Sequence, residues 1–116
     1  MDRLLVVDDD PQVRLSLEST LASDELEVLL AATAREGLAL LESHPPGAVV
    51  LDVRLPDMSG LEAFDLIRKI DPRLPVIIIT AHATTETAIE AMKRGAFEYL
   101  LKPVDLHQLR ELLAKA

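Results

Sequence analysis

The sequence predicts a single three-layer α/β domain with helices on both faces of an open parallel sheet. Five short apolar runs alternate with five patterns of apolar residues at helical spacing. The runs are continuously apolar rather than alternating, which is typical of parallel strands covered on both faces. They span residues 4–7, 28–32, 48–51, 76–80 and 98–101. A closed eight-stranded barrel needs a far longer chain than these 116 residues, so we expect the sheet to be open.

The starts of the predicted helices carry N-cap signals. Asp10 precedes a proline, a residue that favours the first helical position. "TARE" (33–36), "SGLE" (59–62) and "DLHQ" (105–108) have the form of a capping box. The predicted caps are therefore Asp10, Thr33, Ser59 and Asp105, with Thr84 or Thr85 as a weaker cap for the fourth helix. "SHPPG" (43–47), "DPRLP" (71–75) and Gly95 mark helix ends.

Composition and charge exclude several classes of function. The net charge is −8, and the twelve Lys and Arg residues form no basic stripe, which argues against direct binding of nucleic acid. No apolar stretch approaches the roughly 18 residues of a membrane span. The chain has no cysteine, so it lacks disulfides and thiolate sites. "MDRLLVV" enters a strand too early for a secretory signal, and we expect a cytoplasmic protein.

Polar residues follow four of the five predicted strands. They are Asp8, Asp9 and Asp10 after the first strand, Asp52 after the third, Thr80 at the end of the fourth and Lys102 after the fifth. The second run ends in alanines, as expected of an edge strand away from a site. Because open parallel sheets bind ligands beyond the carboxyl ends of their strands, these polar residues indicate one site at that edge.

The residue types at this edge suit metal-assisted phosphoryl transfer. If the first and third strands are neighbours, Asp8 and Asp9 face Asp52, and such an acidic pocket needs a cation, with Mg²⁺ or Mn²⁺ suited to hard oxygen ligands. Asp52 can then attack phosphorus as a carboxylate nucleophile and become an acyl phosphate. Lys102 supplies positive charge and Thr80 a hydroxyl donor for the incoming oxygens.

Each of these residues also has a simpler interpretation. Asp10 is expected to act only as a helix cap, Asp8 and Asp9 taken alone suit a solvated turn, and an isolated Lys102 suits the surface. The coincidence of all of them at strand ends favours the site. Zinc is not expected, because His44, His82 and His107 share no ligand spacing. No serine has the glycine neighbours of a nucleophile elbow.

The chain resembles the receiver domain of two-component response regulators over essentially its whole length. The segments that carry the resemblance are "VVDDD" (6–10), "LDVRLPDMSGLE" (51–62), "PVIIITAHA" (75–83) and "GAFEYLLKPVD" (95–105). The resemblance implies a flavodoxin-like sheet with strand order 2-1-3-4-5 and one receiver domain over residues 1–116. It also implies that Asp52 is phosphorylated by a sensor histidine kinase.

The resemblance assigns roles to the surrounding residues. It implies that Asp9 binds Mg²⁺ directly, that Asp8 acts through water, and that the backbone carbonyl of Arg54 is a third protein ligand alongside Asp52. Thr80 and Lys102 match the switch hydroxyl and the lysine of the family's site. The Lys102–Pro103 bond is expected to be cis.

A switch mechanism follows as a hypothesis. Phosphorylation of Asp52 is expected to draw the Thr80 hydroxyl toward the new oxygens and to let Tyr99, the only tyrosine, rotate inward. This change would alter the surface of the fourth helix, fifth strand and fifth helix, through which we also expect a homodimer. His82 is expected to influence the lifetime of the acyl phosphate.

"TAHATTETAIEAMKRGAFEYLLKP" (80–103) looks most like receivers of the nitrogen-regulatory class, in which a sigma-54-dependent ATPase and a DNA-binding domain follow. Neither is expected here, because the chain has no "GxxxxGK" motif and stops at Ala116, which indicates an excised domain or, as the alternative, a free-standing receiver. The implied partners are the kinase and that output domain.

Two other functions remain open on the sequence. The first is a phosphatase of the haloacid-dehalogenase type, which needs a second Asp where this chain has Arg54. The second is an interaction module that is never phosphorylated, although all five key side chains of an active site are present.

Overall fold

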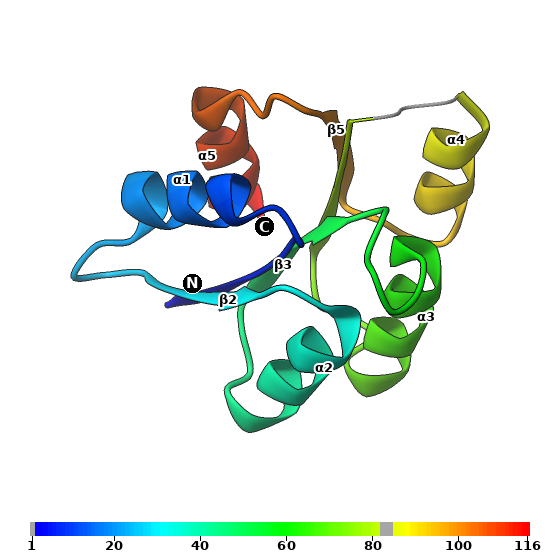
Figure 1. Cartoon of the computed structure of the whole chain (residues 1–116), viewed down its shortest axis with the longest axis horizontal. Helices are drawn as coiled ribbons and strands as arrows, with labels where there is room; N and C mark the ends of the chain where they lie inside the picture. The colour runs from blue at the N-terminus through cyan, green and yellow to red at the C-terminus, as the bar shows by residue number, and fades with distance from the viewer. Residues whose placement is uncertain (1, 82–84) are drawn as a thin grey trace.

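Five parallel strands form one sheet in the order β2-β1-β3-β4-β5, with five helices connecting and flanking them (Figure 1). This computed structural model describes residues 2–81 and 85–116. The elements are β1 (Arg3–Val7), α1 (Pro11–Leu21), β2 (Glu27–Ala31), α2 (Ala34–Ser43), β3 (Ala48–Asp52), α3 (Gly60–Ile70), β4 (Val76–Thr80), α4 (Thr85–Lys93), β5 (Glu98–Leu101) and α5 (Leu106–Lys115). The predicted fold class and strand order are confirmed.

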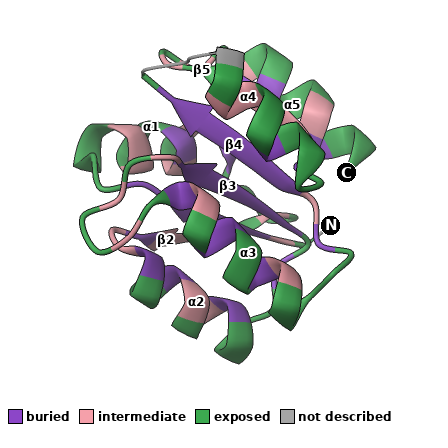
Figure 2. Cartoon of the chain, turned by 90° about the vertical axis from the view of Figure 1, so that its right-hand side faces the viewer, coloured by how far each residue is buried: buried purple, intermediate pink, exposed green. Residues whose placement is uncertain are grey.

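The helices cover both faces of the sheet. Helices α1 and α5 lie on one face, and α2, α3 and α4 lie on the other (Figure 1). Successive strand residues therefore enter different cores: Leu4 packs with α1 and α5, whereas Leu5 packs on the face that carries α3. Every residue of β3 and β4 is buried, which explains their continuously apolar sequences (Figure 2).

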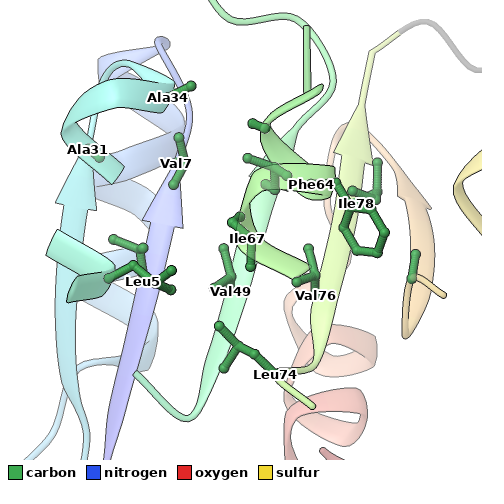
Figure 3. Packing of buried hydrophobic residues seen from close by; sticks show 14 of the residues in the cluster. Leu5, Val7, Ala31, Ala34, Val49, Phe64, Ile67, Leu74, Val76 and Ile78 are labelled. Atoms are coloured by element: carbon green, nitrogen blue, oxygen red, sulfur yellow. The ribbon is translucent and has the colours of Figure 1, made fainter. Parts of the chain in front are cut away.

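The core on the α3 side is centred on an aromatic ring. Phe64 is fully buried and lies with Ile67 over the middle of the sheet, beside Val49, Val76 and Ile78 (Figure 3). Leu74 closes the bottom of this cluster.

None of the helices in residues 2–81 and 85–116 is long and apolar enough to cross a bilayer.

Four of the predicted caps are confirmed. The side chains of Asp10, Thr33, Ser59 and Asp105 each accept a hydrogen bond from a backbone amide in the first turn of the helix that follows. The fourth helix begins at Thr85, and Thr84 and His82 lie outside the described residues. Local capping signals thus located the starts of α1, α2, α3 and α5 correctly.

The first two strands begin one residue earlier than their apolar runs. Arg3 pairs with Glu27 across β1 and β2, and their side chains form a 2.6 Å ion pair. A charged pair can extend an edge of the sheet because both side chains remain partly in water. Arg3 and Glu27 are charged, so the apolar pattern of the sequence did not predict them as strand residues.

Strand register brings the polar strand ends together. Val7 is paired with Leu51, so the next residues, Asp8 and Asp52, emerge side by side at the carboxyl ends of β1 and β3. On the other side of β3, Thr80 at the end of β4 is paired with Leu101 of β5. Four strands therefore deliver polar groups to one edge of the sheet, as predicted from the sequence.

Gly60 allows α3 to begin directly against the end of β3. Its amide donates a 2.6 Å hydrogen bond to the carbonyl of Val53. A Cβ at this position would fall against the carbonyl oxygen of Asp52 and within 2.6 Å of the Val53 Cα. Both obstacles are backbone atoms that a side-chain rotation cannot move.

We expect Gly60→Ala to destabilise the domain by about 1–3 kcal/mol, because the added methyl group must displace backbone. Urea unfolding at neutral pH measures this change. The matched control is Lys69→Ala, an exposed position in the same helix, with an expected change within about 0.5 kcal/mol. Equal stability of Gly60→Ala and the parent would contradict this account of the β3–α3 junction.

Candidate functional site

Three carboxylates meet at the carboxyl ends of β1 and β3. Oxygens of Asp8, Asp9 and Asp52 lie within 4.8 Å of one another. Asp8 is fully buried and Asp52 is 5% exposed, whereas Asp9 is exposed to solvent. At about 4 Å, two such charges repel by about 4 kcal/mol at an effective dielectric constant near 20. The cluster therefore needs positive charge to remain ionised.

Lys102 supplies positive charge to the two buried acids. Its Nζ atom lies 2.7 Å from Asp8 Oδ2 and 3.0 Å from Asp52 Oδ2, and its side chain is only 16% exposed. The Lys102 amide donates a 2.8 Å hydrogen bond to the carbonyl of Thr80, and the bond to Pro103 is cis, as the resemblance implied. The lysine thus links the ends of β1, β3 and β4.

The pKa values of this ion-paired group reflect its burial. Burial raises the pKa of Asp8 above its ordinary value, with the Asp52 charge acting in the same direction and Lys102 opposing it. Burial also acts to lower the pKa of Lys102, but the hydrogen bonds and charges of Asp8 and Asp52 outweigh it, so the pKa of Lys102 is raised. Lys102 is therefore a fixed cation at neutral pH.

Backbone amides orient both buried carboxylates. Asp8 Oδ1 accepts a 2.9 Å hydrogen bond from the amide of Asp10, and Asp52 Oδ1 accepts a 3.1 Å bond from that of Arg54. The Arg14 guanidinium of α1 donates a 2.7 Å bond to the backbone carbonyl of Asp8. Each acid is therefore held at one oxygen by the chain itself and faces Lys102 with the other.

The donor set fits a hard divalent cation. Carboxylate and carbonyl oxygens are the ligands that Mg²⁺ and Mn²⁺ prefer. Asp8 Oδ2 is buried and, within the described residues, meets its ammonium neighbour without a well-directed hydrogen bond, so it retains capacity for another positive partner. Because Asp9 is exposed, a cation can approach the carboxylates from solvent. Gly60 donates its hydrogen bond to the carbonyl of Val53, so this bond does not occupy the carbonyl of Arg54.

The two predicted switch residues lie on β4 and β5. Thr80 is 1% exposed at the end of β4. Tyr99 packs against the core on the α3 side, and its buried hydroxyl has no hydrogen-bond partner among the described residues. Burial raises the pKa of Tyr99. The ring is thus partly buried with its hydroxyl turned inward, which is the position that the sequence analysis expects after phosphorylation.

Two residues near the site carried no recognisable signal in the sequence. Arg14 contacts the Asp8 carbonyl from the first turn of α1, and a single Arg at that position in an amphipathic helix is typical of a solvated residue. Asp57 resembles an ordinary loop acid, yet its carboxylate accepts hydrogen bonds from the amides of Ala34 and Arg35 in α2. Its partners lie over 20 residues upstream, so no local pattern could indicate them.

Known proteins are similar to this chain in sequence or in fold. PilR of Pseudomonas aeruginosa, a response regulator protein, is 45% identical over 114 residues, which cover 98% of this chain and 26% of PilR. The DNA-binding transcriptional regulator NtrC of Salmonella typhimurium is 40% identical over 96% of this chain and 24% of its own length. The chain therefore spans about a quarter of these relatives.

A solved structure agrees over nearly the whole chain. The CheY-like receiver domain protein of Methanospirillum hungatei superposes with a TM-score of 0.93 at 35% identity, covering 99% of this chain and 92% of that one. The family model of the response regulator receiver domain matches residues 4–114. This chain therefore belongs to the response regulator receiver domain family of two-component signalling, and its relatives include the nitrogen-regulatory class of sigma-54-dependent activators.

Proposed function

We propose that Asp52 is the phosphoacceptor of this receiver and that it takes its phosphoryl group from a sensor histidine kinase in a reaction that requires Mg²⁺ or Mn²⁺. The observation that carries the proposal is the buried pair of Asp8 and Asp52, joined by Lys102 at 2.7 and 3.0 Å. A signalling switch, rather than a classical enzyme, is the function of the family to which the chain belongs.

The proposed transfer uses the carboxylate of Asp52 as nucleophile. One of its oxygens attacks the phosphorus of a phosphohistidine, a P–O bond forms, and the P–N bond breaks. The electron pair of the broken bond returns to the imidazole, which takes up a proton. Lys102 stays charged and stabilises the phosphoryl oxygens as they approach the buried carboxylate.

A bound divalent cation would neutralise further charge on the phosphoryl oxygens. The carboxylates of Asp8, Asp9 and Asp52 and the backbone carbonyl of Arg54 are the groups proposed to hold it. The convergence of the three carboxylates within 4.8 Å supports this assignment. Asp8 is proposed to act through water: its Oδ1 accepts from the amide of Asp10, and its Oδ2, beside Lys102, can still accept from a water molecule of the cation.

Thr80 and Tyr99 are proposed to transmit phosphorylation to the surface formed by α4, β5 and α5. A phosphoryl group adds nearly two negative charges and three acceptors, which the Thr80 hydroxyl can approach from the end of β4. The receiving surface carries partly exposed Ile89, Met92 and Leu101, which are 48%, 44% and 56% exposed. Such apolar side chains suit a homodimer or a contact with an output domain.

The proposed output is transcription control by an ATPase and a DNA-binding domain in the same regulator. The support is the similarity to PilR and NtrC, of whose lengths this chain covers about a quarter. The partners proposed for the receiver itself are therefore the kinase on one side and that output region on the other.

The proposal predicts that incubation with acetyl phosphate and Mg²⁺ adds one phosphoryl group to the chain, and that Asp52→Asn removes the adduct. Mass spectrometry of the intact chain and of its peptides measures both. Asp65→Asn is the matched control, because Asp65 lies on the exposed side of α3 in an ion pair with Arg94. Absence of an adduct on the parent, or rapid turnover of phosphate esters, would contradict the proposal.

A second prediction concerns the metal. Beryllofluoride mimics the phosphoryl group. We expect Asp9→Ala to raise the Mg²⁺ concentration that beryllofluoride binding needs by a factor of about 10 or more. Loss of a residue that only orients a metal ligand already lowers metal affinity by about 10-fold or more. The control is Asp10→Ala, which removes a neighbouring acid that caps α1. Binding by Asp9→Ala at the parent's Mg²⁺ concentration would rule out the ligand role.

A third prediction concerns the switch. Phosphorylation is expected to strengthen self-association of the parent by about 5-fold or more, a typical coupling between two sites. Thr80→Ala should still accept phosphate but lose most of this increase, and Thr80→Ser should retain it because the hydroxyl is preserved. Analytical ultracentrifugation with and without beryllofluoride measures the effect. An unchanged response in Thr80→Ala would exclude the coupling.

A further inference from the structure

The loop between β3 and α3 is attached to a second helix through one carboxylate. Asp57 Oδ1 accepts a 2.9 Å hydrogen bond from the amide of Ala34, and Oδ2 accepts one of equal length from the amide of Arg35. These backbone hydrogen bonds lower the pKa of Asp57 below its ordinary value, so the carboxylate is ionised at neutral pH. Its charge also faces the positive end of the α2 dipole.

Two caps from different parts of the chain share the first turn of α2. The hydroxyl of Thr33, the residue just before the helix, accepts a 3.1 Å hydrogen bond from the amide of Glu36. The other two amides of this turn are taken by Asp57, which lies 23 and 22 residues further along the chain. The helix therefore has a local cap and a distant one, and only the distant one involves the β3–α3 loop.

The same loop carries the backbone that the proposed metal site uses. It follows Asp52 and includes Arg54, whose amide donates a 3.1 Å hydrogen bond to Asp52 Oδ1. Its base is closed by the 2.6 Å bond from Gly60 to Val53 and by a bridge between Arg54 and Ser59. Asp57 secures the far side of the loop against α2.

Apolar contacts alone do not define the orientation of this loop. Leu55 and Met58 pack partly buried against the core on the α3 side, but hydrophobic contact has no direction. Two hydrogen bonds donated to one planar carboxylate do define an orientation. Orientation matters here because Mg²⁺ demands nearly ideal octahedral geometry from its ligands, and a backbone carbonyl can only be aimed by its loop.

We propose that Asp57 is a positioning residue for the metal site: by holding the β3–α3 loop to the first turn of α2, it aims the Arg54 carbonyl at the cation without touching it. This inference rests on the proposed function, because it assumes that Asp8, Asp9 and Asp52 bind the cation. Asp57 is not one of the proposed ligands, and its role depends on the first turn of α2, to which it holds the β3–α3 loop.

The test compares Asp57→Ala with Thr33→Ala, which removes the local cap of the same helix turn and leaves the loop attached. We expect Asp57→Ala to raise the dissociation constant for Mg²⁺ by about 10-fold, as for other residues that orient a ligand. Thr33→Ala should remain within about 2-fold of the parent, although it loses a comparable cap. Isothermal titration with MgCl₂, well below the unfolding temperature, measures both.

A second readout needs no metal. In ¹H–¹⁵N spectra of the metal-free protein, the amides of Val53 and Arg54 should shift in Asp57→Ala and stay unchanged in Thr33→Ala. Should the alanine variant not fold, Asp57→Asn, which keeps one acceptor oxygen, takes its place with a smaller expected loss of affinity.

Three outcomes would overturn the inference. Parent-like Mg²⁺ affinity in the Asp57 variant would refute the positioning role while the proposed function stands. Equal losses in the Asp57 and Thr33 variants would show that α2 stability, rather than the loop attachment, is responsible. Failure of the parent itself to bind Mg²⁺ would remove the proposed function and the inference together, so the two failures are distinguishable.

Discussion

The structure depends on the burial of two like charges side by side. Asp8 and Asp52 end neighbouring strands, and pairing of Val7 with Leu51 leaves them no means of separating within the sheet. Buried ions of one sign are unfavourable unless an opposite charge and directed hydrogen bonds accompany them. Lys102 provides the charge, and the amides of Asp10 and Arg54 provide the bonds. With Asp9 included, the site holds three carboxylates and one ammonium group, an imbalance that favours a cation.

The rest of the fold keeps this edge rigid. Strands β3 and β4 are buried throughout, and Phe64 of α3 fills the core beneath them. Arg68 lies over the Phe64 ring at 4.8 Å and donates to the carbonyls of Leu74 and Gly95, so α3 is joined to the segments on both sides of β4. A packed scaffold whose polar groups gather at one edge of the sheet is the arrangement in which a local change of charge can alter a distant surface.

Much of the fold and the site followed from local pattern. Continuous apolar runs reveal buried strands because a parallel sheet is covered on both faces, and caps such as Asp10 and Ser59 reveal helix starts because their partners lie two or three residues away. The sequence alone was enough to group Asp52 with Lys102, since the carboxyl ends of parallel strands meet at one edge. The first residues of β1 and β2, Arg3 and Glu27, were not predicted as strand residues because they are charged and pair only across the two strands.

Signals that act over a few residues, or that repeat along an element, were enough to predict the number and type of the elements, most of their starts and the polar residues that gather at one edge of the sheet. The contacts made across loops could be seen only in the folded molecule. The bonds from Ala34 and Arg35 to Asp57 and the bond from Arg14 to the Asp8 carbonyl depend on how separate segments approach one another. Such approach distances are set by the packing of whole helices on the sheet, which no short stretch of sequence encodes.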